Sequence, residues 1–206
     1  MSGLHLTRRA LAAAAIAFAL TETAALAQQP ARIRGEIEKA DGATLSLKTR
    51  EGASMTVKVA DDARVAALVK ASLADIKTDS FIGVAGMPQP DGSIRAFSIQ
   101  IFLPAQRGVV ADRHGAWDAP PGSTMTNAYV ESMVLAKNGG TLLVKYRDGE
   151  KKIIVTGDTV IAAVAAGKKD ELKPGTSIVI MASDKQADGS TLAKVLYLGR
   201  NIVPAM

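Results

Sequence analysis

Three residues near the middle of the chain carry side chains that bind transition metals. Asp112, His114 and Asp118 offer two carboxylates and one imidazole on a short segment, and both groups are ordinary ligands of zinc and copper. A closed structural site normally needs four strong ligands, whereas this chain has no cysteine and only two histidines. A metal-handling protein with these three ligands is therefore our alternative interpretation, behind a binding surface made by the same segment.

The segment 104–126 also holds the only tryptophan of the chain, Trp117. It belongs to neither of the two repeats described below, and connecting segments often carry function. We expect Trp117 to pack between the two flanking domains, with a ligand groove around it. The residues expected to line this groove are His114, Trp117, Asp118, Met125 and Asn127.

Ser123 does not have the surroundings of a catalytic serine. It lacks the Gly-x-Ser-x-Gly elbow of hydrolases, and His114 is its only possible histidine base after the N-terminal signal. The hydroxyl-rich run 122–127 is better explained as a turn that leads into a strand. We expect a protein that is not an enzyme, and no motif implies a cofactor.

The elements that must position these side chains are written twice. Gly42-Ala-Thr-Leu-Ser-Leu-Lys-Thr-Arg-Glu-Gly52 returns as Gly139-Gly-Thr-Leu-Leu-Val-Lys-Tyr-Arg-Asp-Gly149, and Gln89-Pro-Asp-Gly-Ser93 returns as Gln186-Ala-Asp-Gly-Ser190. Both pairs are offset by 97 positions, and the segment between them is offset by 96. Repetition of this length predicts two small domains of one fold.

The first 27 residues have the pattern of an export signal. Arg8 and Arg9 precede an apolar run at 10–20, and Ala25-Leu26-Ala27 is a small-x-small cleavage site. The apolar run is too short for a permanent membrane helix, and we find no transmembrane segment in the mature chain. Because the two arginines also resemble a twin-arginine motif, the Sec and twin-arginine routes both stay open. We expect a periplasmic protein.

Charge and composition argue against a nucleic-acid partner. The formal net charge is +5, and the cations are spread along the chain, whereas nucleic-acid binding requires a concentrated basic surface and, for single strands, several aromatic platforms. The basic strand faces are a second candidate surface for an unknown periplasmic protein, glycan or small ligand. Their residues are Lys48, Arg50 and Lys58 in the first copy and Lys145, Tyr146, Arg147, Lys151 and Lys152 in the second.

Hydrophobic alternation predicts five strands in each copy. The expected strands are 32–39, 44–49, 54–59, 81–86 and 94–102, then 128–137, 141–147, 151–156, 177–182 and 191–198. The alanine-rich segments 65–70 and 160–166 lose the two-residue alternation, so we expect a short helix at each, and a helical turn at 72–75. Three strands, a helix and two strands is the order of the OB-fold, a five-stranded barrel.

The repeated pattern also resembles a known group of proteins. Gly-Thr-Leu-x-Val-Lys, the Leu-x-Asp-Leu-Lys-Pro-Gly pattern and Asp-Gly-Ser resemble exported bacterial proteins built from OB-like domains of unknown function. The segment from His114 to Ala128 resembles the central motif of an alphaproteobacterial group with two such domains. Members of that group often carry the label "metal ABC transporter permease", which this sequence does not support, because a permease needs several apolar helices. The resemblance implies no catalytic residues.

These observations predict an all-β protein with two tandem OB-like five-stranded barrels, each with one short helix. We expect a signal peptide at 1–27, one barrel at 28–103, a linker at 104–126 that packs against both barrels, and a second barrel at 127–206. An open β-sandwich, or a swapped pair of domains that share strands, is the alternative arrangement. The expected function is that of a periplasmic, non-enzymatic binding or scaffold protein; the oligomeric state is not indicated.

Overall fold

The computed structural model describes residues 32–204, so the expected export signal lies outside the described residues. The described chain is all-β, and its helical segments are three short 3-10 turns, η1 (Leu73–Asp75), η2 (Pro104–Gln106) and η3 (Lys169–Glu171). No helix within residues 32–204 has the length and apolar character to cross a membrane. The strands are β1 (Ile33–Asp41), β2 (Thr44–Thr49), β3 (Ser54–Lys70), β4 (Phe81–Pro88), β5 (Ile94–Ile101), β6 (Arg113–Ala116), β7 (Thr124–Ala136), β8 (Gly139–Tyr146), β9 (Gly149–Thr156), β10 (Val160–Ala166), β11 (Ser177–Lys185) and β12 (Thr191–Arg200).

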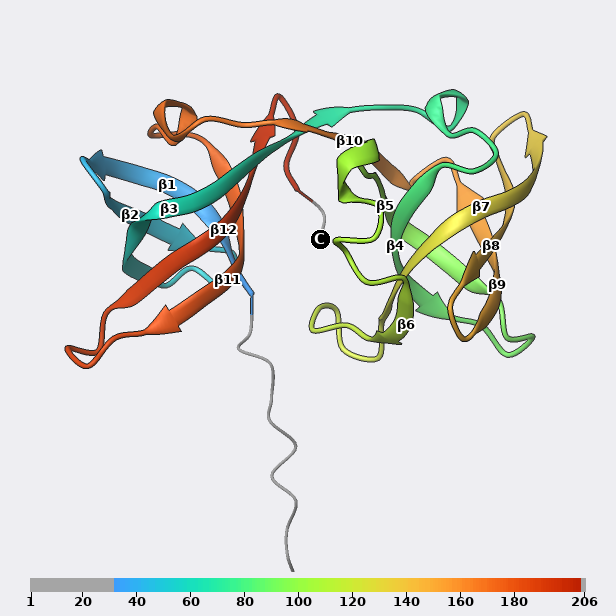
Figure 1. Ribbon diagram of the computed structural model, residues 1–206, viewed down its shortest axis with the longest axis horizontal. Coiled ribbons are helices and arrows are strands. Elements are labelled where there is room, and N and C mark those ends of the chain that lie inside the picture. The colour runs from blue at the N-terminus through green and yellow to red at the C-terminus, as the bar shows by residue number, and fades with distance from the viewer. Residues whose placement is uncertain (1–31, 205–206) are drawn as a thin grey trace, which may run out of the picture.

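Five strands close into a ring at each end of the molecule (Figure 1). The first barrel runs β1–β2–β3–β12–β11 and returns to β1, with β3 and β12 parallel. The second barrel runs β7–β8–β9–β5–β4 and returns to β7, with β9 and β5 parallel. Closure pairs the edges that short strands would otherwise expose.

Each barrel takes strands from both copies of the repeat. The first barrel combines β1–β3 of the first copy with β11 and β12 of the second, and the second barrel combines β7–β9 with β4 and β5. The expected tandem arrangement, with one barrel at 28–103 and the other at 127–206, is therefore not what the strand pairing shows. The chain has the alternative topology, in which the two copies exchange their last two strands.

The exchange follows from the two segments that we expected to be helices. β3 continues through residues 65–70 to Lys70, and residues 160–166 form β10. A helix would have turned the chain back onto its own barrel, whereas an extended strand advances about 3.3 Å per residue and carries it across to the other one. The helix predictions were wrong here, and only the expected turn near 72–75 forms, as η1.

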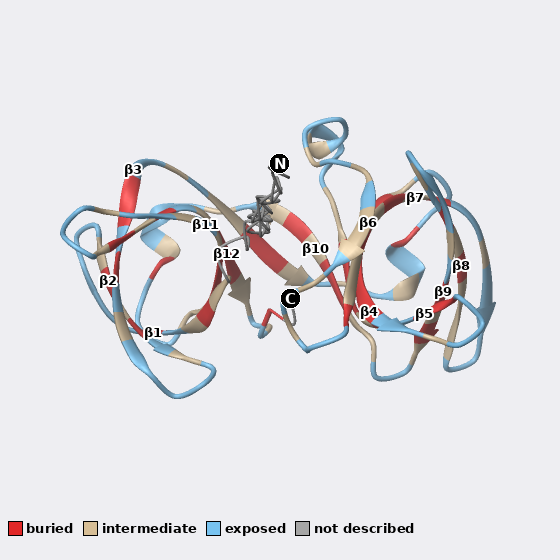
Figure 2. Ribbon diagram, turned by 90° about the horizontal axis from the view of Figure 1, so that it is seen from below, coloured by how far each residue is buried: buried red, intermediate tan, exposed pale blue. Residues whose placement is uncertain are grey.

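The crossing strands lost their alternation because both of their faces are buried. On β3, Ala67 points into the core of the first barrel, while the adjacent Leu68 belongs to a cluster between the barrels. On β10, Ile161 packs in the core of the second barrel and Ala162 in the cluster between the barrels. Figure 2 shows this buried stretch of β10 between the two barrels. Covered strands of this kind do not show a polar face.

The crossing strands also pair with each other. β3 and β10 are antiparallel, with Ala66 opposite Ala166, Leu68 opposite Val164 and Lys70 opposite Ala162. Leu68 and Val164 are 96 positions apart, which is the repeat offset in this part of the chain, so Leu68 pairs with its equivalent residue in the second copy. The two copies therefore meet around a local twofold axis, and we call the apolar cluster at this axis the seam. Its buried members are Leu68, Ala162, Val164 and Tyr197.

The repeated turns have the same hydrogen bonds in both copies. Gln89 N donates to Ser93 O at 2.8 Å, and Gln186 N donates to Ser190 O at 2.8 Å. The carboxylates of Asp91 and Asp188 accept from the backbone N–H two residues later, at 3.0 and 2.9 Å. The glycine in each turn has a positive φ, 81° at Gly92 and 79° at Gly189, a conformation that other residues rarely adopt. This agreement fixes which residues of the two copies are equivalent.

Candidate functional site

The segment that holds Trp117 lies against both barrels. β6 pairs with the start of β7 in the second barrel, with His114 opposite Thr126 and Ala116 opposite Thr124. Beyond β6, Trp117 and Asp118 reach β1 of the first barrel. We call residues 113–127 the strap, because they join the barrels on the outside as β3 and β10 join them through the seam.

Asp118 is held by two arginines of the first barrel. Its carboxylate accepts two hydrogen bonds from the guanidinium of Arg34, at 2.8 and 3.1 Å, and one from the backbone N–H of Arg32 at 3.1 Å. Burial alone would raise the pKa of Asp118, but these hydrogen bonds and the two arginine charges outweigh it and lower the pKa to about 2. The carboxylate is therefore ionised and fully engaged, which suits a structural clasp.

Trp117 and Met125 cover the seam. Both pack against its buried cluster, and the guanidinium of Arg32 lies 3.8 Å from the centre of the Trp117 ring. Contacts between a cation and an aromatic face at this distance stabilise by roughly 0.5–2 kcal/mol. Trp117 therefore contributes to the join between the barrels rather than lining an open groove.

His114 points to a different region, the end of the second barrel. Its Nδ1 lies 2.8 Å from the hydroxyl of Thr126, and its ring lies 6.0 Å from the ring of Tyr146. Burial lowers the pKa of His114, and the nearby charge of Lys151 lowers it further. The imidazole of His114 is therefore mostly neutral at pH 7. Its ring lies over this end of the second barrel.

The two remaining candidates, Asn127 on the strap and Asp112 just before it, are also separated. Asn127 donates from Nδ2 to the backbone oxygen of Ala111 at 3.2 Å, and Asp112 lies 3.5 Å from the guanidinium of Arg147. Among residues 32–204 no three His, Cys, Asp or Glu side chains are grouped to hold a metal ion. The expected metal set of Asp112, His114 and Asp118 is thus not brought together, nor do the five expected groove residues line one groove.

Two other predicted features have structural roles. Ser123 donates from Oγ to the backbone oxygen of Pro120 at 2.6 Å, so its hydroxyl closes the turn before β7. On the basic face of the second barrel, the single aromatic residue, Tyr146, packs against the barrel core instead of standing on the surface. On the first barrel, Lys58 pairs with Asp188 at 3.4 Å. These faces offer no aromatic platform for a base or a sugar ring.

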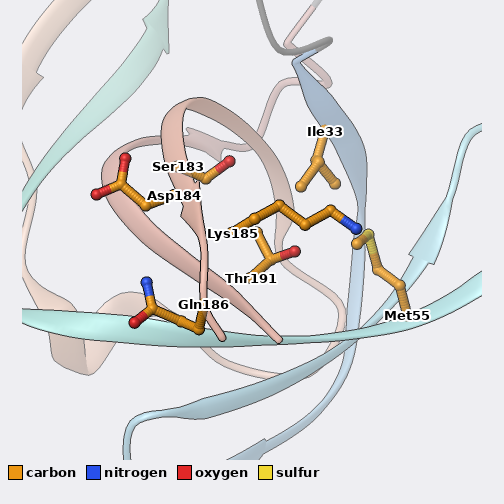
Figure 3. A pocket seen from close by; sticks show the side chains of 7 residues that line it. All are labelled: Ile33, Met55, Ser183, Asp184, Lys185, Gln186 and Thr191. Carbon is orange, nitrogen blue, oxygen red and sulfur yellow. The ribbon is translucent and has the colours of Figure 1, made fainter. Parts of the chain in front are cut away.

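A pocket that the sequence patterns did not indicate lies at one end of the first barrel (Figure 3). It has a volume of about 820 Å³, within the range of small-molecule sites. Its walls come from the start of β1, the start of β3 and the β11–β12 hairpin. The lining residues are Ile33, Met55, Ser183, Asp184, Lys185, Gln186 and Thr191.

The lining side chains divide between the two faces of the hairpin. Successive side chains of a strand alternate in direction, so Ser183 and Lys185 point to the inside of the barrel, and Lys185 is paired with Thr191 across the hairpin. In Figure 3, Lys185 extends toward Ile33 and Met55, while Asp184 and Gln186 point away. Asp184 instead binds Lys194 on the outer face at 2.5 Å. This end of the barrel therefore combines two apolar groups, two hydroxyls and the ammonium group of Lys185, which is an exposed residue.

The corresponding end of the second barrel is built differently. The repeated turn makes Ile94 the equivalent of Thr191, and Ile94 is 2% exposed in the second barrel's core. Val84 and Ile180 are equivalent positions, 96 residues apart. Ile33 pairs with Ile180, and Thr126 pairs with Val84, so Thr126 occupies the position of Ile33 in the second barrel. Lys151 stands in the place of Met55, and His114 and Tyr146 lie over this end.

One sequence signal could have located the pocket. When the repeated turns are superposed, Ser93-Ile94 faces Ser190-Thr191, so a core isoleucine of one copy is a threonine in the other. Threonine has less apolar volume than isoleucine, so this difference indicates that the barrel containing Thr191 is less completely filled at this position. The signal lies in a difference between the two copies, whereas the repeat itself is recognised by their similarity.

Comparison of the chain with protein-family models, with curated proteins and with solved structures found no match. The pocket can bind a small molecule through an apolar wall, hydroxyl groups and an ammonium group. The strap, with its engaged carboxylate and partly buried aromatic ring, joins the two barrels.

Proposed function

We propose that this chain is an exported, non-enzymatic binding protein made of two OB-like barrels that exchange strands, with its ligand site at the open end of the first barrel. The OB-like assignment is supported by the strand order 1-2-3-5-4 in each ring and by the parallel pairing of the third and fifth strands. The proposed location in the periplasm is supported by the signal-like sequence of residues 1–27.

The observation that carries the proposal is the contrast between two equivalent barrel ends. A core that is merely structural is expected to be filled in both copies, because interiors pack at nearly uniform density. In the second barrel this end holds Ile94 and is covered by His114, whereas in the first barrel it holds a pocket of about 820 Å³. The lining residues lie on β1, β3, β11 and β12, apart from Gln186 in the β11–β12 turn.

The test is native mass spectrometry of the mature protein after incubation with a small-molecule extract of the cells that make it. Wild-type protein should retain a small molecule, and Thr191→Ile, which copies the residue of the second barrel, should lose it. Lys39→Gln, at an exposed lysine of β1 that does not line the pocket, is the control and should retain it. Equal retention by wild type and Thr191→Ile, or retention by neither, would overturn this site.

Export is tested separately. The protein recovered from the periplasm should have Gln28 as its first residue, and replacement of both Arg8 and Arg9 should leave it in the cytoplasm. Recovery of an uncleaved chain from the cytoplasm in the wild type would contradict the proposed location.

A further inference from the structure

The interior of the pocket has a marked chemical asymmetry. Ile33 and Met55 pack against the core of the first barrel and make an apolar wall. Ser183, Lys185 and Thr191 lie together on the inner face of the β11–β12 hairpin, because Lys185 is opposite Thr191 and Ser183 is two positions away on the same strand. A ligand that fills this space meets hydrocarbon on one side and hydrogen-bond donors on the other.

The charge of Lys185 is not balanced by a described residue. No hydrogen bond or ion pair joins Lys185 to any side chain among residues 32–204. The nearest acids of the hairpin have other partners: Asp184 binds Lys194 at 2.5 Å, and Asp188 binds Lys58 at 3.4 Å. An ammonium group beside apolar side chains favours an anion, because hydrogen bonds between charged partners are stronger than neutral ones.

From these groups we infer that the pocket binds a single-chain amphiphile with an anionic head group, a carboxylate or a phosphate. The head lies against the Lys185 ammonium group and the hydroxyls of Ser183 and Thr191. The hydrocarbon chain lies against Ile33 and Met55. This inference rests on the proposed function and specifies the class of ligand for the same site.

The second barrel explains why the ligand would bind at one end only. There the lysine of the hairpin is replaced by Pro88 and the serine by Gly86, and Ile94 fills the place of Thr191. A Cβ on Gly86 would approach Ile94 Cγ2 to 2.5 Å, so the interior at this point is already full. The anion-binding groups and the space for a chain are thus both confined to the first barrel.

The experiment titrates the full mature protein with decanoate, decyl phosphate, 1-decanol and decylamine. Calorimetry gives the affinities, and the NMR signal of the ¹³C-labelled Met55 methyl group, assigned with Met55→Leu, reports on the site. The Met125 methyl group at the seam is the internal reference and should not shift. We expect decanoate or decyl phosphate to shift Met55 and to bind at least about tenfold more tightly than decanol and decylamine. The comparison of the two anions identifies which head group is preferred.

Two variants separate the head group from the chain. Lys185→Gln should weaken the anions about tenfold or more and leave decanol unchanged, whereas Lys39→Gln, at an exposed lysine of β1 outside the pocket, should change neither. Thr191→Ile should abolish binding of all four probes. If decanol or decylamine binds as tightly as the anions, the anionic class is wrong while the pocket stands. If no probe shifts Met55, the inferred ligand is wrong; loss of a cellular ligand in Thr191→Ile would then still support the proposed function.

Discussion

Thr191 in the first barrel and Ile94 in the second follow the same five-residue turn, yet they meet different surroundings. Ile94 lies in a continuous core with Ile153 and Leu142, and the strap covers the barrel end beside it. Thr191 is also buried, with 8% of its surface exposed, but it lines the pocket. The exchange gives both barrels the same five-strand ring, so the difference arises from a few substitutions and from the strap.

The strap is also the element that breaks the local symmetry at the outer surface. It pairs with β7 and covers the second barrel with His114, and it then reaches the first barrel with Trp117 and Asp118. One segment therefore closes one barrel and fastens it to the other. The difference between the two barrel ends can be tested by exchanging their residues, and the role of the strap by removing its contact with the first barrel.

The largest effect is expected when the filled end is made to resemble the open one. Ile94→Thr removes apolar volume from a side chain that is 2% exposed and buries a hydroxyl. The free energy of unfolding should fall by about 2–3 kcal/mol, measured by urea denaturation. A change below the error of that measurement would mean that the second barrel is not closed at this position.

Release of the strap should have the next largest effect. Asp118→Ala leaves Arg34, which is 7% exposed, without the carboxylate that binds it twice. We expect a loss of about 1–3 kcal/mol in the free energy of unfolding, together with a change in Trp117 fluorescence because the neighbouring ring loses its anchor. Asp112→Ala, with its carboxylate 3.5 Å from the exposed Arg147, is the control and should have little effect.

The same carboxylate predicts a dependence on pH. The pKa of Asp118 is lowered to about 2 in the folded protein, and that of an aspartate in an unfolded chain is about 3.9. The unfolded state therefore binds the proton first on acidification, so the stabilisation is complete above about pH 5 and is lost as the pH falls toward 2. Because the group is partly exposed, the loss should be about 1–2 kcal/mol. Urea midpoints from pH 5 to pH 2 should fall less steeply in Asp118→Ala than in the wild type.

A smaller pH effect is expected at His114. Its folded pKa is lowered by burial and then by Lys151, so below the unfolded value near 6.5 the unfolded chain binds the proton more readily. Stability should therefore decrease as the pH falls from about 7 to 5. His114→Gln should remove this slope between pH 7 and pH 5, and an unchanged slope would show that the ring is not partly buried beside Lys151.

The reciprocal exchange at the open end should have the smallest effect on stability. Thr191→Ile introduces into the pocket a residue that the second barrel already accommodates at the equivalent position. The free energy of unfolding should change by less than about 1 kcal/mol, while ligand retention is lost. A large destabilisation, comparable with that of Ile94→Thr, would show that the first barrel has no space at this site.

Local patterns predicted most of the strands and the turns between them. Leu45 and Leu47 in β2, and Val57 and Val59 in β3, alternate with polar residues and point into the core as expected. The Asp-Gly-Ser turns form with the same hydrogen bonds in both copies. These features depend on residues close in sequence, so a single sequence is enough to predict them.

The crossing strands and the site were not predictable in the same way. The two-residue alternation expected of a strand assumes that one of its faces is exposed to solvent, so alanine-rich segments without alternation indicated helices. In the structure, Ala67 and Leu68 are buried on opposite faces of β3 by two different clusters. His114 and Asp118 are four positions apart, but β6 directs His114 to the second barrel before the chain reaches Arg34 at Asp118. Proximity in sequence therefore suggested a shared site that the backbone direction prevents.

The amino-acid sequence by itself determined that this protein has two copies of a five-stranded unit, with the period of each strand and the chemistry of each turn. The tertiary structure decided which copy supplies the last two strands of each barrel, and which barrel end stays hollow. The physical reason is that the same alternating strands can close a ring within a copy or between copies. Closure between copies depends on non-local burial, because β3 and β10 bury Leu68 against Val164 at the seam. Which barrel end stays open depends on differences in side-chain volume, such as Thr191 in place of Ile94. These differences can be read only when the two rings are superposed.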